Sequence, residues 1–505
     1  MQTLRRIGSD YAAQIAGFAV AMADRLLVPG LFLRALGVPA FSTWSVVVAG
    51  ASLITALDFG VTRFYTNRLI AEVERGEDAA ARASFAHGFA LLLGISVVAG
   101  LALVGWTYAG GLGTGDAEAD RLLPEVMVPV TAALAMRLAI SLHVALFRAH
   151  RAFALETVLG SATDLVRIVV LVAALVAGLP LVAITWVWSV ATVLLGLLLV
   201  WLSLRRHPHF STGLALPGRA ELAAMSKVAA GLWLSMAFNV GFMAIPTVLL
   251  GHLAASALAV AQFILLRTLA NFARQMVNLF SNVFGLELAR RHAAADDAGL
   301  VQVFGEASRL LATQIGLGCG ILVVAGQDLF QLWTGKPELF SASMLAWAMG
   351  PMLLTANSLL AVEMLAYANR PWPIVHARVA QVALSIVLFA ALPLAHAQER
   401  MMAALGLAEV LGLGFWLTLS LRRVHPELGL RFYVRNVAVA CTTALLCAGL
   451  AWPARLLPLT GLGRAAVLVA AAGLAALLLF PIFGFAGARR RQLLGAARGL
   501  FRRAL

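Results

Sequence analysis

The sequence predicts an all-α polytopic membrane protein with about fourteen transmembrane helices. The chain of 505 residues is 61% hydrophobic and only 12% charged, whereas soluble proteins carry about 45–50% apolar and about 25% charged residues. Because so few charged side chains could not cover the surface of a soluble protein, the excess apolar side chains must face lipid. This composition excludes a soluble enzyme. The formal net charge of +14 is typical of arginines that flank membrane spans and does not require nucleic-acid binding.

Apolar stretches of about 20 residues, the length that crosses a bilayer, mark the predicted helices in order. These stretches are too long and continuous for barrel strands, which alternate every second residue over about ten residues. Helices therefore remain as the way to satisfy backbone groups in lipid. The fourteen stretches lie at 11–33, 41–66, 84–109, 123–146, 153–178, 181–203, 224–250, 255–286, 305–330, 340–367, 373–394, 401–421, 433–452 and 464–486.

The first stretch is predicted to be a retained helix. Arg5 and Arg6 resemble the charged start of a signal peptide, but Asp24 and Arg25 interrupt the apolar run, which is also too long for a signal. The fifth and sixth stretches are separated only by a tight break at 178–180. The loop at 204–223 is basic and is the longest, and it leaves six helices before it and eight after.

Loop arginines predict the orientation. One side of the predicted membrane carries 25 Lys and Arg residues and the other side only six. Because cytoplasmic loops carry the excess of positive charge, both ends of the chain are predicted to be cytoplasmic. An even number of spans follows.

Polar residues repeat on one face of the eighth predicted helix at spacings of four, three, four and three, which is a helical period. Such a stripe is either a seam of hydrogen bonds between helices or the wall of a hydrated, anion-attracting cavity. The second interpretation is favoured because no acidic residue accompanies the two arginines within the stripe. The stripe consists of Arg267, Asn271, Arg274, Asn278 and Ser281.

Further ionisable residues fall inside predicted spans, where each is costly unless it has a partner or faces a cavity. Arg25 with Asp24 on the first helix, and Asp58 with Arg63 on the second, are candidate cavity residues. Asp164 and Arg167, three residues apart, are instead predicted to neutralise each other. Either role is open for Arg137, next to Ser141, and for Arg378, next to Gln381. Glu363 and Glu409 are either proton-coupling carboxylates or, as we favour, hydrogen-bonded helix contacts.

The sequence lacks the residue patterns that several kinds of chemistry require. The chain has only two lysines, Lys227 and Lys336, and neither completes a phosphate-binding loop. The three cysteines show neither metal-ligand spacing nor a disulfide pattern. The pair His207 and His209 could contact a metal, but a solvated loop is the preferred interpretation. We therefore predict no catalytic residues, no cofactor and no metal.

Short motifs resemble those of bacterial polysaccharide-export flippases of the multidrug/oligosaccharidyl-lipid/polysaccharide (MOP) superfamily. The first loop and second helix resemble the family at Ala35-Leu36-Gly37, Phe41-Ser42-Thr43-Trp44, Leu57-Asp58-Phe59-Gly60 and Asn67-Arg68. The basic segment Leu146-Phe147-Arg148-Ala149-His150-Arg151 resembles its short loop after the fourth helix, and Leu332-Trp333-Thr334-Gly335 resembles its outer loop after the ninth.

The resemblance implies two six-helix lobes around a central cavity. The corresponding parts of this chain are an N-terminal lobe at 1–204, a cytoplasmic loop at 205–222, a second lobe at 223–423, and an extra helix pair with a basic tail at 424–505. It also implies transport of a polyprenyl-pyrophosphate-linked oligosaccharide by alternating access, in the bacterial inner membrane, for surface polysaccharide synthesis. A polysaccharide polymerase and glycosyltransferases are the implied partners.

The resemblance also implies that cationic cavity residues receive the pyrophosphate. Arg25 resembles the functional arginine of the lipid II branch, and Arg63 and Arg267 lie on comparable helices. Two alternatives stay open. A cation-coupled multidrug antiporter would use acidic residues such as Asp24 and Asp58, although that branch typically has about twelve helices. A membrane-embedded enzyme of the same pathway usually needs a large external loop, which this sequence lacks.

The predicted orientation can be tested with reporter fusions. We expect fusions after residues 115 and 330 to report an external location and fusions after 212 and 298 to report a cytoplasmic one, because the arginine asymmetry fits only that register. Paired alkaline phosphatase and green fluorescent protein fusions measure both outcomes. One reversed fusion would contradict the predicted topology.

Overall fold

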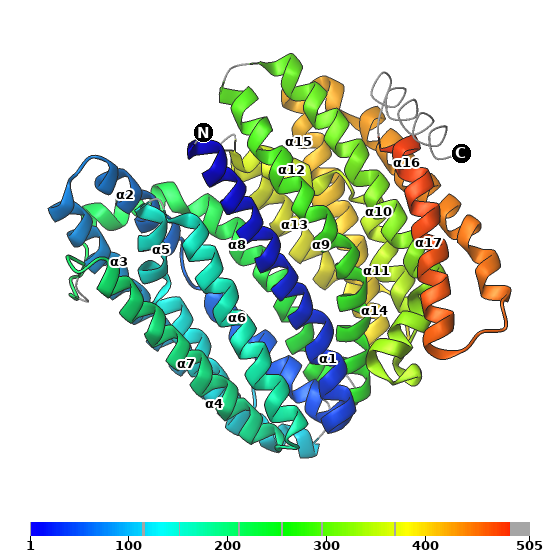
Figure 1. Cartoon of the computed structure of the whole chain (residues 1–505), viewed down its shortest axis with the longest axis horizontal. Helices are drawn as coiled ribbons and strands as arrows, with labels where there is room; N and C mark the ends of the chain where they lie inside the picture. The colour runs from blue at the N-terminus through cyan, green and yellow to red at the C-terminus, as the bar shows by residue number, and fades with distance from the viewer. Residues whose placement is uncertain are drawn as a thin grey trace. The chain divides into compact units, whose positions relative to one another are not determined.

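The computed structural model describes residues 2–113, 117–150, 152–210, 213–253, 256–293, 296–367 and 370–484. These residues form helices joined by short loops and include no β-strand. The chain divides into two compact units, Met1–Ala261 and Gln262–Leu505, whose helices are labelled in Figure 1. The all-α polytopic fold that the composition predicts is thereby confirmed.

The first unit consists of long helices broken at glycines. The helical run α1 bends at Gly37, where φ is +80°, a conformation that favours glycine. A second break follows α1 at Phe59 and Gly60, which have φ values of 51° and 75°. The helices of this unit are α1 (Gln2–Ala56), α2 (Val61–Glu74), α3 (Asp78–Tyr108), α4 (Ala117–Ala139), α5 (Ser141–Ala149), α6 (Phe153–Val176), α7 (Leu181–Arg206) and α8 (Arg219–Leu253).

The second unit contains more interrupted helices. Its longest regular helix is α10 (Asp297–Thr334), and a π-helical segment, η2 (Glu409–Phe415), joins α14 to α15. The remaining elements are α9 (Ala257–Ala293), whose first residues belong to the first unit, η1 (Pro337–Leu339), α11 (Ala342–Leu354), α12 (Ser358–Tyr367), α13 (Trp372–Ala391), α14 (Ala397–Ala408), α15 (Trp416–Val424), η3 (Pro426–Leu428), α16 (Leu430–Ala451), η4 (Trp452–Leu456) and α17 (Gly461–Phe483).

Each of the fourteen predicted stretches overlaps a helix, but not every one of these helices is by itself long and apolar enough to cross a membrane. Among the described residues, eleven helices are long and apolar enough to cross a membrane, or twelve if the bent pair α11 and α12 forms one span. The first two predicted spans meet at Gly37, where the run α1 is two helices joined at a kink. Among the described residues of α9, Ala257–Phe272 forms a shorter apolar helix.

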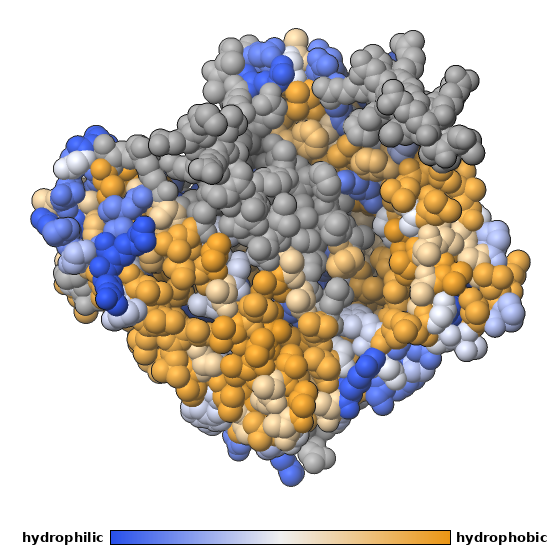
Figure 2. All heavy atoms as spheres, in the orientation of Figure 1, coloured by the Kyte–Doolittle hydropathy of each residue, from blue (hydrophilic) through white to orange (hydrophobic). Residues whose placement is uncertain are grey.

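The outer surface of the first unit is suited to lipid. Figure 2 shows an apolar band over α6 and α7, and hydrophilic side chains gather near the α2–α3 connection. Large apolar side chains on α6 and α7 are exposed, among them Val169, Val176, Trp186, Leu194 and Trp201. This exposure would be unfavourable in water and is favourable in a bilayer.

Helix α8 packs with the first unit. The indole Nε1 of Trp233 donates a 2.7 Å hydrogen bond to the carbonyl oxygen of Ala56. At the start of α8, Glu221 accepts a 2.7 Å hydrogen bond from Arg68, which also forms an ion pair with Glu72. The division between units therefore falls later in the chain than the predicted lobe boundary at 205–222. The assignment of α8 to the second lobe of a transporter stays a prediction, because packing alone does not decide with which lobe a helix moves.

Helices α10, α16 and α17 form the most closely packed part of the second unit, and they lie side by side in Figure 1. Gly316 and Gly320, four residues apart, allow the α16 backbone to approach α10. A Cβ atom on Gly316 would lie 2.4 Å from the carbonyl oxygen of Ala440, and one on Gly320 would lie 2.7 Å from Cβ of Cys447. This small-xxx-small spacing is a common contact between membrane helices.

The close contact between α10 and α16 predicts the effect of adding a side chain. We expect Gly320→Val to destabilise the protein by about 1–3 kcal/mol, because the new methyl groups would collide with α16. Gly449→Val is the matched control, since a Cβ at Gly449 would meet no atom within 4 Å. Thermal unfolding in detergent measures both variants, and equal midpoints for the two would contradict the packing described here.

Candidate functional site

Ionisable side chains within the helices gather in two places, one in each unit. In the first unit they line a cavity between α2, α4, α5, α6 and α7. In the second unit they lie where α9, α13 and the segment η2 carry arginines and a glutamate. We describe each cluster from its own residues.

Asp58 lies at the break that precedes the cavity helix α2. Its Oδ1 atom accepts hydrogen bonds from the backbone N–H and the hydroxyl of Thr62, both at 3.0 Å. This carboxylate therefore satisfies an amide in the first turn of α2, where negative charge is favourable. The Thr62 hydroxyl also lies 3.0 Å from the Ser141 hydroxyl on α5, so the turn is connected to the cavity wall.

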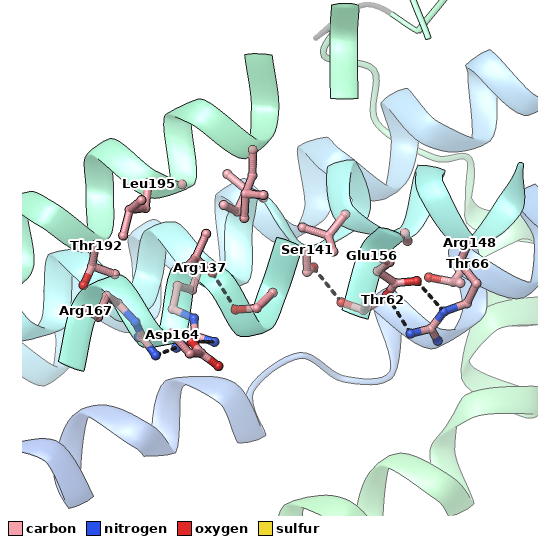
Figure 3. A pocket seen from close by; sticks show the side chains of 17 residues that line it. Thr62, Thr66, Arg137, Ser141, Arg148, Glu156, Asp164, Arg167, Thr192 and Leu195 are labelled. Atoms are coloured by element: carbon pink, nitrogen blue, oxygen red, sulfur yellow. Dashed lines mark hydrogen bonds and ion pairs between the residues drawn. The ribbon is translucent and has the colours of Figure 1, made fainter. Parts of the chain in front are cut away.

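The cavity of the first unit has a volume of about 320 Å³. Figure 3 shows charged side chains at its two ends and the hydroxyls of Thr62 and Ser141 between them. At one end, Arg167 forms an ion pair with Asp164, and Nη2 of Arg137 lies 3.6 Å from Oδ1 of the same carboxylate. Arg167 also interacts electrostatically with Asp24 of α1.

A second ion pair forms the other end of the cavity. Arg148, at the end of α5, makes two hydrogen bonds to Glu156 in the first turn of α6, with lengths of 3.0 and 2.7 Å. This parallel arrangement is the strong, bidentate form of an arginine–carboxylate contact. Each carboxylate lining the cavity is thus already paired with a guanidinium.

The second cluster is centred on Glu409. Nη2 of Arg274 lies 2.8 Å from Oε2 of Glu409, and both side chains are largely buried. The Thr355 hydroxyl lies 3.4 Å from the other carboxylate oxygen. Glu409 is the first residue of the π-helical segment, and such segments frequently occur at functional sites.

Arg378 and Gln381 place more buried polar atoms beside the same segment. Nη1 of Arg378 donates a 2.9 Å hydrogen bond to Oε1 of Gln381, while the Arg378 Nε and Gln381 Nε2 atoms are buried and have no hydrogen-bond partner. Gly412 lets η2 approach α13 closely, since a Cβ there would lie 2.6 Å from the Gln381 backbone. Both Arg378 and Arg274 lie within the electrostatic influence of Glu409.

Arg267 completes the second cluster. Its guanidinium lies 5.6 Å from the ring centre of Phe263, in cation–π geometry. Arg267 also interacts electrostatically with Arg274 and Glu409. Around Glu409 the described residues thus bring together three guanidiniums and one carboxylate.

The other predicted site residues are placed as follows. Arg25 has a side chain outside the described residues, as does Asn278 of the α9 stripe. The side chain of Arg63 on α2 is exposed, and so is that of Asp24 on α1, whereas Asn271 on α9 and Glu363 on α12 are half-buried. Whether Arg25 and Arg63 act with Arg267 stays a prediction.

The structure adds a contact to one sequence-based interpretation. No acidic residue lies within the arginine stripe on α9, but η2 brings Glu409 to Arg274. The pair Asp164 and Arg167 was expected to be self-neutralising, and the ion pair is confirmed. Its position in a cavity wall, together with Arg148 and Glu156, was not predicted, because three separate helices contribute these and the neighbouring Arg137.

The histidines of the loop after α7 differ from each other. His207 is buried and its ring stacks on His150 with 4.0 Å between ring centres, whereas His209 is exposed. Burial, together with His150 and Arg206, lowers the pKa of His207 to about 4, so its ring is neutral at physiological pH. Within the described part of the chain, no group of three or more His, Cys, Asp or Glu side chains could hold a metal ion.

The comparisons with known proteins concern the fold. No protein-family model and no curated protein matches the sequence. Among solved structures, the lipid II flippase MurJ in an inward closed conformation matches 95% of this chain and 98% of its own, with a TM-score of 0.65 and 10% identity. The chain has the fold of the MOP superfamily.

Multidrug transporters of that superfamily also match. An inward-facing MATE-family transporter covers 82% of this chain and 98% of its own length, with a TM-score of 0.58 and 15% identity. An outward-facing one covers 84% and 96%, with a TM-score of 0.51 and 16% identity. At these identities the likeness concerns the fold, and it agrees with the all-α polytopic membrane architecture that the sequence predicts.

The second cluster predicts unequal effects of removing its members. We expect Glu409→Ala to destabilise the protein by about 3–5 kcal/mol, because a buried pair would lose one partner. Arg274→Ala should cost less, since Glu409 keeps the attraction of Arg267 and Arg378. The double variant should be more stable than the sum of the two single effects predicts.

Thermal unfolding of the detergent-purified variants measures these differences. Glu338→Ala is the control, because Glu338 is exposed and lies 3.8 Å from Lys336, an arrangement worth about 0–1 kcal/mol. Additive single effects, or a smaller loss for Glu409→Ala than for Arg274→Ala, would contradict the described cluster.

Proposed function

We propose that this chain translocates a polyprenyl-pyrophosphate-linked oligosaccharide across the bacterial cytoplasmic membrane by alternating access, for the synthesis of a surface polysaccharide. The observation that carries this proposal is the gathering of three guanidinium groups around Glu409. Buried charge within a membrane protein is costly, and a multivalent anion that binds there during function would stabilise these arginines.

The chemistry of the second cluster suits a diphosphate. Arginine presents a planar fork of donors that binds phosphate oxygens in pairs. Arg267 and Arg274 lie seven residues apart on α9, about 10–11 Å along the helix axis, and Arg378 has a buried Nε without a partner. The donor geometry favours a multivalent anion over a neutral ligand.

The fold comparisons lend further support to a lipid-linked cargo. The flippase MurJ matches 95% of this chain, whereas the two MATE transporters match 82% and 84%. A larger part of this chain therefore has a counterpart in a flippase of a lipid-linked substrate. The exposed apolar side chains of α6 and α7 are consistent with a multi-pass protein in the inner membrane.

Export of cationic drugs is the second candidate function, because MATE transporters share the fold. Such cargo requires carboxylates that are free to bind it. Here Asp58 accepts two hydrogen bonds from Thr62, and Asp164, Glu156 and Glu409 each contact an arginine. The described carboxylates are thus already engaged, which favours the anionic cargo. A transport role also agrees better with this fold than a membrane-embedded enzyme does.

Reconstitution tests the proposed function directly. In proteoliposomes, we expect the chain to expose inner-leaflet polyprenyl-pyrophosphate oligosaccharide to a glycosidase added outside, without ATP, because the sequence lacks a phosphate-binding loop. Empty vesicles provide the control, in which about half of the lipid should resist cleavage. Uptake of ethidium along a proton gradient, with no movement of the oligosaccharide lipid, would favour the drug-exporter alternative.

Transport should depend more on one of the two α9 arginines than on the other. We expect Arg267→Ala to abolish transport and Arg274→Ala to reduce it less, because Glu409 already neutralises Arg274. Lysine at either position should restore transport only in part, since it keeps the charge and loses the planar fork. Arg121→Ala, at an exposed position, is the control. Normal transport by both alanine variants, at normal protein level, would contradict the diphosphate site.

A further inference from the structure

The connection between α16 and α17 is a short hairpin within the second unit (Figure 1). Both helices are long and apolar enough to cross a membrane, and the candidate spans end at Leu456 and begin again at Gly461. Because only residues 457–460 separate the two spans, this turn must lie where the bilayer meets water. In the predicted topology, that boundary is the outer surface of the membrane.

The tip of this hairpin is apolar and exposed. Leu456 keeps 80% of its surface accessible and Leu462 keeps 67%, and the large apolar side chains of Trp452, Leu457 and Leu459 are exposed as well. Such a tip would be unfavourable in water, whereas tryptophan is enriched at the level of the lipid headgroups. The tip therefore lies within the lipid interface.

Two arginines of the hairpin share one carboxylate of α10. Nε of Arg464 lies 3.1 Å from Oδ1 of Asp328, and Nη2 of Arg455 lies 3.9 Å from Oδ2 of the same side chain. The Arg455 guanidinium also lies 5.0 Å from the ring centre of Trp452. We call Asp328, Arg455 and Arg464 the hairpin cluster. Its two guanidiniums and one carboxylate carry one net positive charge.

The arginines of the hairpin cluster retain donors for a ligand. A guanidinium carries five N–H donors, and the 3.9 Å contact of Arg455 with Asp328 is too long for a hydrogen bond. Within the described part of the chain, the Nε atoms of Arg455 and Arg464 are buried and have no hydrogen-bond partner. Both side chains remain partly exposed, so an acceptor in the interface can reach their outer nitrogen atoms.

The start of α17 adds positive potential beside Arg464, which lies in its first turn. Thr460, the residue before this helix, makes no side-chain cap hydrogen bond, so the first amides of α17 are available to an acceptor. A Cβ added at Gly461 or Gly463 would meet no atom within 4 Å. Open space for an anionic group therefore lies next to these amides.

We propose that the hairpin cluster and the start of α17 bind the phosphate of an anionic phospholipid in the outer leaflet, with the apolar tip against its acyl chains. A phosphodiester with one negative charge, as in phosphatidylglycerol, balances the charge of the cluster, and its oxygens suit the planar fork of arginine. Phosphatidylcholine fits less well because its ammonium group restores the positive charge. This site goes beyond the proposed function, because it shares no residue with the clusters described above.

A fluorescence measurement at the tip identifies the neighbouring lipid. Leu459→Cys carries a bimane label in the full chain, and the unmodified chain, labelled in parallel, corrects for the native cysteines. The protein is reconstituted in mixtures of phosphatidylcholine and phosphatidylglycerol, of which one carries brominated acyl chains that quench the label. We expect phosphatidylglycerol to be favoured at the tip by about tenfold or more, because charge-assisted hydrogen bonds to its phosphate are strong.

Two double variants, each in the Leu459→Cys chain, separate a built site from general attraction of anionic lipid. Arg455→Gln with Arg464→Gln should remove the preference for phosphatidylglycerol. The matched control is Arg205→Gln with Arg206→Gln at the end of α7. It removes the same charge, and Arg205 likewise lies over an exposed tryptophan, 5.1 Å from the ring centre of Trp201. The control should keep the preference.

Removing the carboxylate gives a result of the opposite sign. Asp328→Asn should strengthen the preference, because the hairpin cluster gains one positive charge, whereas a cluster that only joins α10 to α17 would show no preference to strengthen.

The lipid assignment is overturned if the chain with native arginines shows no preference, or if the α7 control loses it equally. It is also overturned if inorganic phosphate removes the preference, since the site would then take free phosphate. None of these results bears on the proposed function, which the movement of the oligosaccharide lipid in proteoliposomes tests separately.

Discussion

Arginine guanidiniums inside an apolar protein need partners. Neighbouring helices supply carboxylates as these partners, and both functional clusters form around them. Asp164 serves two arginines of the first unit, and Glu409 lies among three in the second. Removing such a partner leaves a buried charge that neither lipid nor protein can solvate.

The two units meet the same constraint in different ways. In the first, the carboxylates Asp164 and Glu156 are paired with arginines around a cavity that retains space and hydroxyl groups. In the second, one carboxylate is shared among three guanidiniums, and buried donors on Arg378 and Gln381 have no partner. A diphosphate would supply the negative charge that the guanidiniums around Glu409 attract, and this match is the physical basis of the proposed function.

Much of the architecture could be predicted because it depends on local properties of the chain. Apolar length alone locates the helices, and motifs such as Leu57-Asp58-Phe59-Gly60 suggested the fold that the comparison with MurJ supports. Gly37 joins two helices at the break that the sequence predicts between the first two spans.

The site was less predictable because its contacts join distant segments. The period of α9 revealed Arg267, Asn271 and Arg274, but nothing in that stretch indicates Glu409, which follows Arg274 by 135 residues. The cavity of the first unit likewise depends on how five helices pack. Sequence spacing identifies the face of one helix, whereas the partner of that face depends on the tertiary structure.

The most direct test of the central claim is an electron cryomicroscopy structure of the chain in lipid nanodiscs with polyprenyl-pyrophosphate oligosaccharide bound. Our account predicts density for the diphosphate within hydrogen-bond distance of the Arg267 or Arg378 guanidinium. Diphosphate density remote from these arginines would contradict it.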